Sequence, residues 1–304
     1  MDKFECIRAF TRVVETGGFA AAARELELSR SAVSKLVIQL ENNLGTQLLH
    51  RTTRHVSPTE TGLAFYERCV RILADLEEAE LAISNLHGEP RGTLKINAPM
   101  SFGTLYLGSA VADFMTRYPD LQVQLTLDDR FVDPIEEGYD VVVRIAHPAE
   151  WAGLIVCPIA PAPRILCASS TYLQKYGTPH HPDELRNHAC LHYGYLTTRN
   201  QWILHGLDGE YRVPIRSTLC SNNGEVLRDA ALCGLGIALL PAFIVSNDLE
   251  DGRLQSVLPD YHPPEIVISM IYPVNRHLSA KVQLFTEFLR SRFGNLSESQ
   301  VGPG

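Results

Sequence analysis

Four hydrogen-bonding side chains lie within six positions of one another, in an arrangement that suits contacts with nucleic-acid bases. These residues are Arg30, Ser31, Ser34 and Lys35. Apolar residues recur at helical spacing over positions 31–44, and packing that stripe inward leaves the four side chains exposed at the amino-terminal end of the helix. Cations and short hydroxyls at the start of a helix can reach base edges in a major groove. The pattern predicts a helix that reads DNA.

A second polar cluster, Arg51-Thr52-Thr53-Arg54, follows the expected helix. Two arginines and two hydroxyls in one hairpin-like loop could hold phosphates. Upstream, the alanine-rich segment 20–26 predicts a short helix, while Ser29 can cap the next helix and Gly45 can end it. This order predicts a winged helix-turn-helix at residues 1–57. The alternative is an ordinary three-helix core with a charged face.

The segment LELSRSAVSK at 26–35, followed by QLE at 39–41, LG at 44–45, RT at 51–52 and TETG at 59–62, resembles the amino-terminal signature of LysR-type transcriptional regulators. The resemblance covers residues 1 to about 65 and continues more loosely, in element order, over the rest of the chain. Two positions depart from it. Arg30 stands where the family usually has glutamine, which suggests a preference for guanine or phosphate. Ile38 replaces a polar or basic residue, so one expected DNA contact would be missing.

A long amphipathic helix is expected over residues 58–87. Its apolar stripe comprises Leu63, Tyr66, Val70, Leu73, Leu76, Ile83 and Leu86. A helix of roughly 28 residues cannot bury such a stripe against so small a domain. The resemblance implies that its partner is the same helix of a second subunit, which would place two DNA-reading helices on one inverted-repeat site. The alternative is that the stripe packs on the chain's own carboxy-terminal half.

The pattern changes after a hinge at residues 88–92. Strands are expected at 93–98, 122–127, 140–145, 164–168, 190–193, 237–240 and 266–272, alternating with helices at 103–118, 132–137, 170–176, 225–233 and 280–293. This alternation predicts parallel sheets with buried strands. Crossing strands near 161–165 and 262–268 would divide residues 93–294 into one lobe of about 93–163 plus 265–294 and another of about 164–264. This multidomain α plus α/β architecture looks like a periplasmic solute-binding fold, as the resemblance also implies, with a flexible tail at 295–304.

A cleft between such lobes would hold a small ligand near strand ends and helix starts. The expected effector-binding residues are Ser101, Phe102, Asp129, Arg144, Asn222 and Asn223, with Tyr193, Tyr195 and Trp202 as aromatic walls. Arg144 is a cation where carboxylate recognition would need one. In the alternative reading, Ser101 and Asn223 are helix caps, Arg144 forms a salt bridge with Asp128 or Asp129, and the aromatic residues belong to the core.

Several chemistries find no support in the sequence. The H-E-x-x-H motif, the G-x-S-x-G elbow, the P-loop and the G-x-G-x-x-G fingerprint are absent, so we expect no catalytic residues and no cofactor. His188 and His192 lie in a segment that enters an expected strand, where residues four apart are too distant to share a metal ion. Seven cysteines without a C-x-x-C pair argue against a disulfide framework or a zinc knuckle. With no signal peptide and no apolar run long enough for a membrane, we expect a cytoplasmic location.

The net charge of −8 argues against a protein that coats nucleic acid nonspecifically, but the segment up to Val56 carries more cations than acids. We therefore expect a regulator that binds double-stranded DNA at a promoter inverted repeat. A small-molecule effector, an organic or aromatic acid, would control it, and it would dimerise through residues 58–87 and pair further into tetramers, with RNA polymerase as a further candidate partner. One alternative is a DNA-binding regulator that senses oxidation through cysteine chemistry. Another is a cytoplasmic solute-binding protein with a helical head.

Overall fold

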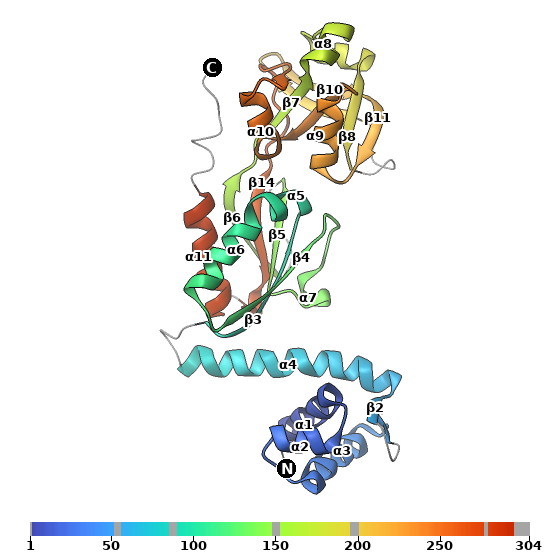
Figure 1. Ribbon diagram of the computed structural model, residues 1–304, viewed down its shortest axis with the longest axis vertical. Helices are drawn as coiled ribbons and strands as arrows, with labels where there is room; N and C mark the ends of the chain where they lie inside the picture. The colour runs from blue at the N-terminus through green and yellow to red at the C-terminus, as the bar shows by residue number, and fades with distance from the viewer. Residues whose placement is uncertain are drawn as a thin grey trace. The chain divides into compact units, whose positions relative to one another are not determined.

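The computed structural model describes residues 2–51, 56–84, 90–147, 153–194, 201–276 and 279–294. Contacts divide the chain into two compact units, residues 1–88 and 89–304, whose elements are labelled in Figure 1. Among the described helices, none combines the length and the apolar character that crossing a bilayer requires. Residues 1–88 are called the amino-terminal unit below, and residues 89–304 are called the regulatory unit.

The amino-terminal unit begins with three helices, α1 (Lys3–Thr16), α2 (Phe19–Glu25) and α3 (Arg30–Leu44). Asp2 and Ser29 cap α1 and α3, since each side-chain oxygen accepts a hydrogen bond of 3.1 Å from a first-turn amide. Gly17 and Gly45 end the same helices at φ values of 69° and 67°. Only glycine adopts this conformation without steric cost, so both stops follow from the sequence.

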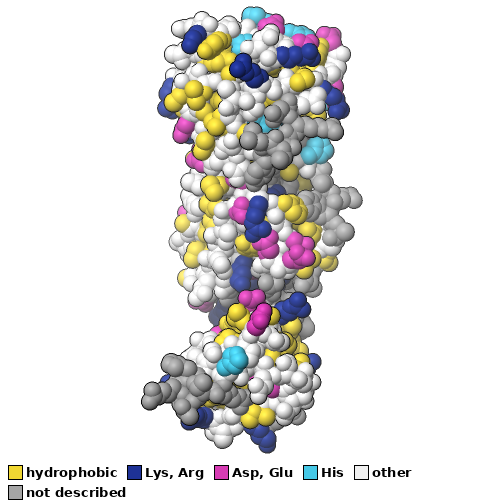
Figure 2. All heavy atoms as spheres, turned by 90° about the vertical axis from the view of Figure 1, so that its right-hand side faces the viewer, with side chains coloured by type: hydrophobic (Ala, Val, Ile, Leu, Met, Phe, Trp, Pro, Cys, Tyr) yellow, Lys and Arg dark blue, Asp and Glu magenta, His cyan; other side chains and the backbone are white. Residues whose placement is uncertain are grey.

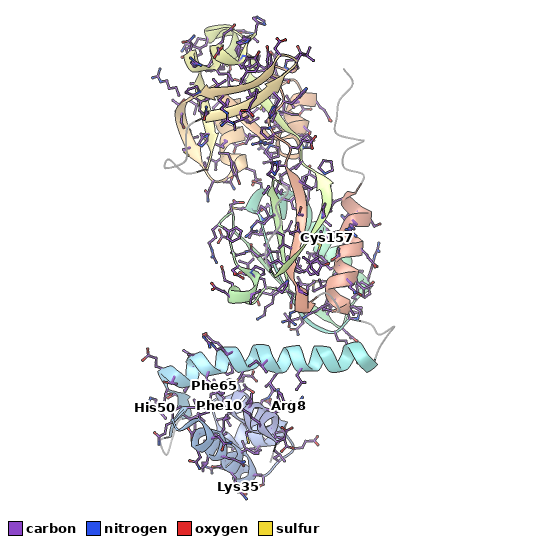
Figure 3. The ribbon with its side chains drawn as sticks, turned by 180° about the vertical axis from the view of Figure 1, so that it is seen from behind. Arg8, Phe10, Lys35, His50, Phe65 and Cys157 are labelled. Atoms are coloured by element: carbon purple, nitrogen blue, oxygen red, sulfur yellow. The ribbon has the colours of Figure 1, made fainter. Side chains whose placement is uncertain are left out.

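Two short antiparallel strands, β1 (Leu49–Arg51) and β2 (Val56–Pro58), form the wing and lead into the long helix α4 (Glu60–Ser84). The core of the unit lies between α1, α3 and the first turns of α4. Figure 3 shows Phe10 and Phe65 side by side, with ring centroids 5.8 Å apart. Two residues of the expected stripes, Leu44 in α3 and Leu63 in α4, are exposed instead, and Leu36 is buried in α3. The far end of the expected long helix, the tail and part of the hinge lie outside the described residues.

The first lobe of the regulatory unit contains a five-stranded sheet in the order β4-β3-β5-β14-β6. Its strands are β3 (Gly92–Ala98), β4 (Leu121–Leu127), β5 (Val141–Ala146), β6 (Leu154–Pro161) and β14 (Val267–Pro273). β3 runs parallel to β4 and β5, but β14 is antiparallel to β5 and β6. The expectation of a parallel sheet was therefore wrong. β14 returns from the other lobe without a helical crossover, so it enters the sheet from the opposite end.

Helices pack on this sheet and complete the first lobe. They are α5 (Met100–Phe102), the π-helical η1 (Gly103–Leu107), α6 (Gly108–Arg117), α7 (Pro134–Glu137), the 3-10 turn η3 (Val274–Arg276) and α11 (Ala280–Phe293). Phe114 of α6 lies edge-on to Phe285 of α11, with centroids 5.1 Å apart. The helix expected from residue 103 begins at Met100, because residues 100–117 are helical throughout.

The second lobe holds another mixed five-stranded sheet, in the order β11-β8-β12-β7-β13. Its strands are β7 (Arg164–Ser169), β8 (Ala189–Tyr193), β11 (Arg216–Ser221), β12 (Ile237–Pro241) and β13 (Leu254–Ser256). A separate hairpin joins β9 (Gln201–Gly206) to β10 (Gly209–Pro214). The lobe's helical segments are α8 (Ser170–Tyr176), the 3-10 helix η2 (Pro182–Asn187), α9 (Gly224–Leu232) and α10 (Ala242–Glu250).

The chain crosses between the lobes twice, after β6 and before β14. Ala162 donates a backbone hydrogen bond of 2.9 Å to the Ile266 carbonyl, so the two crossings run side by side. Their positions agree with the crossing segments expected from the sequence. The expected helices at 170–176 and 280–293 also match α8 and α11, whereas β6, β9, β10, β11, β13 and α10 were not expected.

Candidate DNA-binding surface and ligand pocket

The first turns of α3 present a polar surface to solvent. Arg30, Ser31 and Lys35 are exposed and Ser34 is half-buried, while Val33 and Val37 on the opposite side are fully buried. The Ser29 and Ser31 hydroxyl oxygens lie 2.9 Å apart, so Ser31 is tied to the cap. Figure 3 shows Lys35 pointing away from the core, and Figure 2 shows other basic side chains on the surface of this unit. The four residues named from their spacing thus share one accessible end of a helix.

Glu41 positions the wing relative to α3, a role that sequence reasoning did not assign to it. Its Oε1 accepts hydrogen bonds from the amides of Leu48 and Leu49, at 2.9 and 3.1 Å. Arg51 lies on β1, but Thr52, Thr53 and Arg54 lie outside the described residues. Ile38 lies on α3 with 42% of its surface exposed, and its side chain has no polar group.

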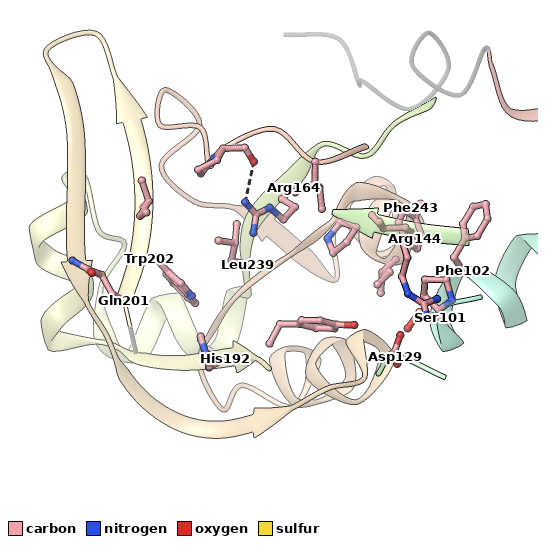
Figure 4. A pocket seen from close by; sticks show the side chains of 18 residues that line it. Ser101, Phe102, Asp129, Arg144, Arg164, His192, Gln201, Trp202, Leu239 and Phe243 are labelled. Carbon is pink, nitrogen blue, oxygen red and sulfur yellow. Dashed lines mark hydrogen bonds between the residues drawn. The ribbon is translucent and has the colours of Figure 1, made fainter. Parts of the chain in front are cut away.

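A cavity of about 420 Å³ lies between the two lobes of the regulatory unit (Figure 4). Four of the six expected effector-binding residues line it: Ser101, Phe102, Asp129 and Arg144. The complete lining is Pro99, Ser101, Phe102, Asp129, Arg144, Ile145, Arg164, His192, Tyr193, Gln201, Trp202, Ile203, Leu239, Pro241, Phe243, Ile244, Pro264 and Ile266. A pocket of this size with mainly apolar walls and a few polar groups is typical of small-molecule sites.

Arg144 is held in the pocket by neutral oxygens. Its Nη2 donates to the Asn97 side-chain oxygen at 2.6 Å and to the Arg130 carbonyl at 2.8 Å, and its Nη1 donates to the Val143 carbonyl at 2.7 Å. The suggested salt bridge to Asp128 or Asp129 does not occur among the described residues, because Asp128 pairs with Arg130 at 2.6 Å. Burial lowers the pKa of Arg144, and the nearby Asp128 and Asp129 charges oppose that shift.

Asp129 lies at the same end of the pocket as Arg144. Its Oδ1 accepts a hydrogen bond of 3.1 Å from the Met100 amide. Burial raises the pKa of this carboxyl group, against the effects of the Met100 hydrogen bond, the Arg144 charge and the Tyr193 hydroxyl. Its Oδ2 is buried and has no hydrogen-bond partner within the described part of the chain. Asp129 therefore brings a buried carboxylate oxygen to the lining of the pocket, beside Tyr193.

Asn222 and Asn223 do not line the cavity. The Asn223 side-chain oxygen caps α9 by accepting a hydrogen bond of 3.0 Å from the Val226 amide, as the capping alternative anticipated, and Asn222 is exposed. The N-cap of α5 is Pro99, so Ser101 is not the cap of that helix. The Asn223 side-chain oxygen already accepts the capping hydrogen bond. Polar residues before a helix often serve as caps in this way, so their presence does not by itself indicate a ligand contact.

The aromatic residues divide between pocket and core. Tyr193 and Trp202 line the cavity, and Tyr195 lies outside the described residues. Phe102 is 1% exposed and packs edge-on to Phe243 and Phe293, with ring centroids 5.8 and 5.4 Å away. It therefore belongs to the core that supports the pocket, with one edge at the cavity.

Arg164 is a pocket residue that the sequence did not reveal. It is the first residue of β7, and its Nη2 donates a hydrogen bond of 2.9 Å to the Pro264 carbonyl in the returning crossing segment. Its Nε is buried without a partner among the described residues. The only signal in the sequence was that Arg164 is a basic residue in the expected crossing segment. An analysis based on the spacing of apolar residues does not detect such a position.

The remaining histidines and cysteines show no catalytic grouping in the part of the chain that the structure describes. No cluster there could hold a metal ion. His188 Nδ1 lies 3.2 Å from the Tyr172 hydroxyl, so this histidine has a structural partner. Burial raises the pKa of the Cys167 and Cys190 thiols to about 12, which keeps them protonated and unreactive, whereas Cys233 is exposed.

Comparison with known proteins agrees with both halves of this description. Residues 4–63 match the family model of the bacterial regulatory helix-turn-helix protein, lysR family, and residues 87–294 match the LysR substrate binding domain. The chain is 38% identical over 282 residues to an uncharacterised HTH-type transcriptional regulator of Haemophilus influenzae, covering 93% of this chain and 98% of that protein. It is 36% identical over 291 residues to the HTH-type transcriptional regulator DmlR of Escherichia coli, covering 94% and 93%.

Solved structures lead to the same family. The LysR-type regulator CrgA of Neisseria meningitidis is 32% identical, with a TM-score of 0.62 over 96% of this chain and 99% of that one. The full-length virulence activator AphB of Vibrio cholerae is 28% identical, with a TM-score of 0.60 over 96% and 99%. The helix-turn-helix described above lies in the first of the two matched ranges, and the two-lobed domain lies in the second. The chain therefore belongs to the LysR family of bacterial transcriptional regulators.

Proposed function

We propose that this regulator recognises an inverted-repeat promoter site through the first turns of α3 in two subunits. The exposed edge formed by Arg30, Ser31 and Lys35, backed by buried Val33 and Val37, carries the proposal. The exposed hydroxyls and cations can bond to base edges, whereas the wing residues 51–54 would hold phosphates. Arg30, at the leading position of α3, is the residue suited to a bidentate contact with guanine.

Two subunits would meet through α4. Leu63 and Ile72 on this helix each expose 48% of their surface, so the amino-terminal unit leaves large apolar side chains uncovered there. A symmetric dimer would cover them and present two α3 helices to successive half-sites. This supports a stoichiometry of at least two subunits for each inverted repeat.

The test is fluorescence anisotropy with DNA fragments from upstream of the protein's own gene, at low ionic strength. Arg30→Ala should weaken binding to the cognate fragment by about 1–3 kcal/mol and leave binding to random DNA nearly unchanged. Lys3→Ala, which removes an exposed cation from the start of α1, is the matched control and should bind normally. Equal losses on cognate and random DNA would reduce Arg30 to a phosphate contact. Absence of binding to every upstream fragment would refute the proposal.

We further propose that a small organic acid binds in the interlobe cavity and biases the arrangement of the subunits. The polar groups at Ser101, Asp129 and Arg144, within largely apolar walls, support this assignment. A ligand that binds there should raise the melting temperature of the full chain and change its affinity for DNA. A ligand that raises the melting temperature equally in the wild type and in Arg144→Ala would contradict the part assigned to Arg144.

A further inference from the structure

Arg164 lies at the point where the chain first enters the second lobe. The hydrogen bond from its Nη2 to the Pro264 carbonyl joins it to the returning segment, beside the 2.9 Å bond between Ala162 and Ile266. Figure 4 shows Arg164 apart from the group formed by Ser101, Asp129 and Arg144. The cavity therefore has two cationic positions on separate parts of its wall, one of them at the crossing between the lobes.

The positive charge of Arg164 has no counterion among the described residues. No carboxylate forms an ion pair with it there, and burial alone lowers its pKa. Arg144 differs, because the acids Asp128, Asp129 and Glu137 lie near enough to oppose the effect of burial on its pKa. A partly buried cation without a partner is unfavourable for the empty protein. An anion at Arg164 would remove that cost and gain charge-assisted hydrogen bonds.

The part of the cavity beside Arg144 and Asp129 favours a neutral polar group of the ligand over a second anionic group. Arg144 Nε is a buried donor and Asp129 Oδ2 a buried acceptor, and neither has a partner in the described structure. A hydroxyl group can accept from the first and donate to the second. A carboxylate placed there would meet the acidic group of Asp129, so repulsion would offset its attraction to Arg144.

Building on the proposed effector site, we propose that the ligand is a hydroxylated organic acid whose carboxylate binds Arg164 and whose hydroxyl group lies between Arg144 and Asp129. Its apolar body would contact the hydrophobic wall, to which Leu239 and Ile266 contribute. This assignment moves the anionic end of the ligand from Arg144, the anchor expected from the sequence, to Arg164. Because Arg164 lies at the crossing, the same carboxylate would lie beside the segment that joins the two lobes.

The experiment compares three probes of one shape on the full chain: 4-hydroxycinnamate, cinnamate and 4-hydroxycinnamyl alcohol. Binding is measured by the ligand-dependent shift in melting temperature and by titration calorimetry. The wild type should prefer the hydroxy acid over both analogues. Arg164→Gln should weaken binding of the two acids by about tenfold to a hundredfold, as expected for a lost charge-assisted contact, and leave the alcohol unaffected.

Three further variants separate the roles. Arg164→Lys keeps the charge and should retain part of the preference for acids, and Arg144→Gln should reduce the preference for the hydroxy acid over cinnamate. Arg186→Gln removes an exposed cation on η2 that pairs with Asp183 and should behave as the wild type. Without ligand, Arg164→Gln should melt close to the wild type, because removal of an uncompensated charge offsets the loss of the hydrogen bond to the Pro264 carbonyl. That result would show that the variant folds.

The outcomes distinguish this inference from the proposed function. If Arg164→Gln still prefers acids over the alcohol, or if the wild type binds acids and alcohol equally, the assignment to Arg164 is overturned while an effector site in the cavity stands. If none of the probes changes the melting temperature or the DNA affinity of the wild type, the assignment and the proposed class of effector fall together. The DNA-binding test with Arg30→Ala is independent of both results.

Discussion

Replacing Gly62 with alanine should loosen the junction between the wing and α4. A Cβ atom at this position would lie 1.9 Å from the Leu48 carbonyl oxygen and 2.8 Å from its carbonyl carbon. Ordinary contacts of a Cβ atom begin near 3.4 Å, so the first turn of α4 would have to move by about 1.5 Å. Backbone atoms on one side and a helix on the other leave no flexible side chain to absorb this movement.

The magnitude follows from the contacts at this junction. Overpacking costs about 1–3 kcal/mol. The movement would also break the hydrogen bond from the Thr59 amide to the Leu48 carbonyl, 2.9 Å long, at a cost of about 1 kcal/mol. The gain from replacing glycine by alanine inside a helix is about 0.5–1 kcal/mol and roughly offsets that lost bond. We therefore expect the amino-terminal unit to lose about 1–3 kcal/mol of stability.

Hydrogen exchange of the full chain, followed by mass spectrometry, measures this loss locally. Amides of α1, α3 and the start of α4 should exchange about fivefold to 150-fold faster, since about 1.4 kcal/mol corresponds to tenfold, while the regulatory unit remains unchanged. Gly18→Ala is the matched control, because a Cβ atom there meets nothing within 4 Å and its φ of −178° suits any residue. Wild-type protection in Gly62→Ala would show that the junction yields easily and would refute the reasoning.

Two other predictions use the same full-length protein. Ser29→Ala should lower the stability of α3 by about 1 kcal/mol, because the helix loses its cap. Ser29→Asp should keep the cap but weaken DNA binding, because it places an acid near phosphates. Identical exchange rates of the α3 amides in the wild type and both variants would contradict the capping role. Burial lowers the pKa of His188, whose Nδ1 lies 3.2 Å from the Tyr172 hydroxyl oxygen. The stability that this histidine contributes is therefore complete above about pH 6.5 and declines as the pH falls below that value. His188→Gln should lose less melting temperature than the wild type between pH 7 and pH 5, and equal slopes would exclude His188 as the cause.

The helices of the amino-terminal unit could be predicted closely because their boundaries depend on local chemistry. Ser29 and Gly45 mark the ends of α3, and each acts through its own side chain or backbone conformation. The exposed and buried sides of α3 follow from the spacing of its apolar residues. The errors fall at Leu44 and Leu63 near the helix ends, where periodicity says little about which residues the neighbouring helices cover.

The regulatory unit was predicted less completely because its sheets depend on long-range pairing. Pattern analysis found β5 and β12, which are short and mostly apolar runs, and β3, in which buried Leu94 and Ile96 alternate with polar residues. It missed the hairpin β9–β10, whose two-residue turn is Leu207-Asp208, one position before the Asp208-Gly209 dipeptide that commonly marks a hairpin. The antiparallel placement of β14 depends on where the chain returns from the other lobe, which no local pattern encodes.

The pocket shows most clearly what a sequence conceals. Ser101, Asp129 and Arg144 could be named because each follows or ends an expected strand, a position that the fold class makes informative. Arg164 begins a strand, and the rule that ligands bind at the carboxyl ends of strands therefore does not identify it. Its importance comes from the lack of a carboxylate counterion among the described residues. A buried arginine is a candidate to bind the carboxylate of a ligand when no carboxylate of the protein pairs with it. That condition depends on the three-dimensional surroundings of the residue. Charge compensation, rather than residue type, therefore separates the two pocket arginines, and it assigns the anion of the ligand to Arg164.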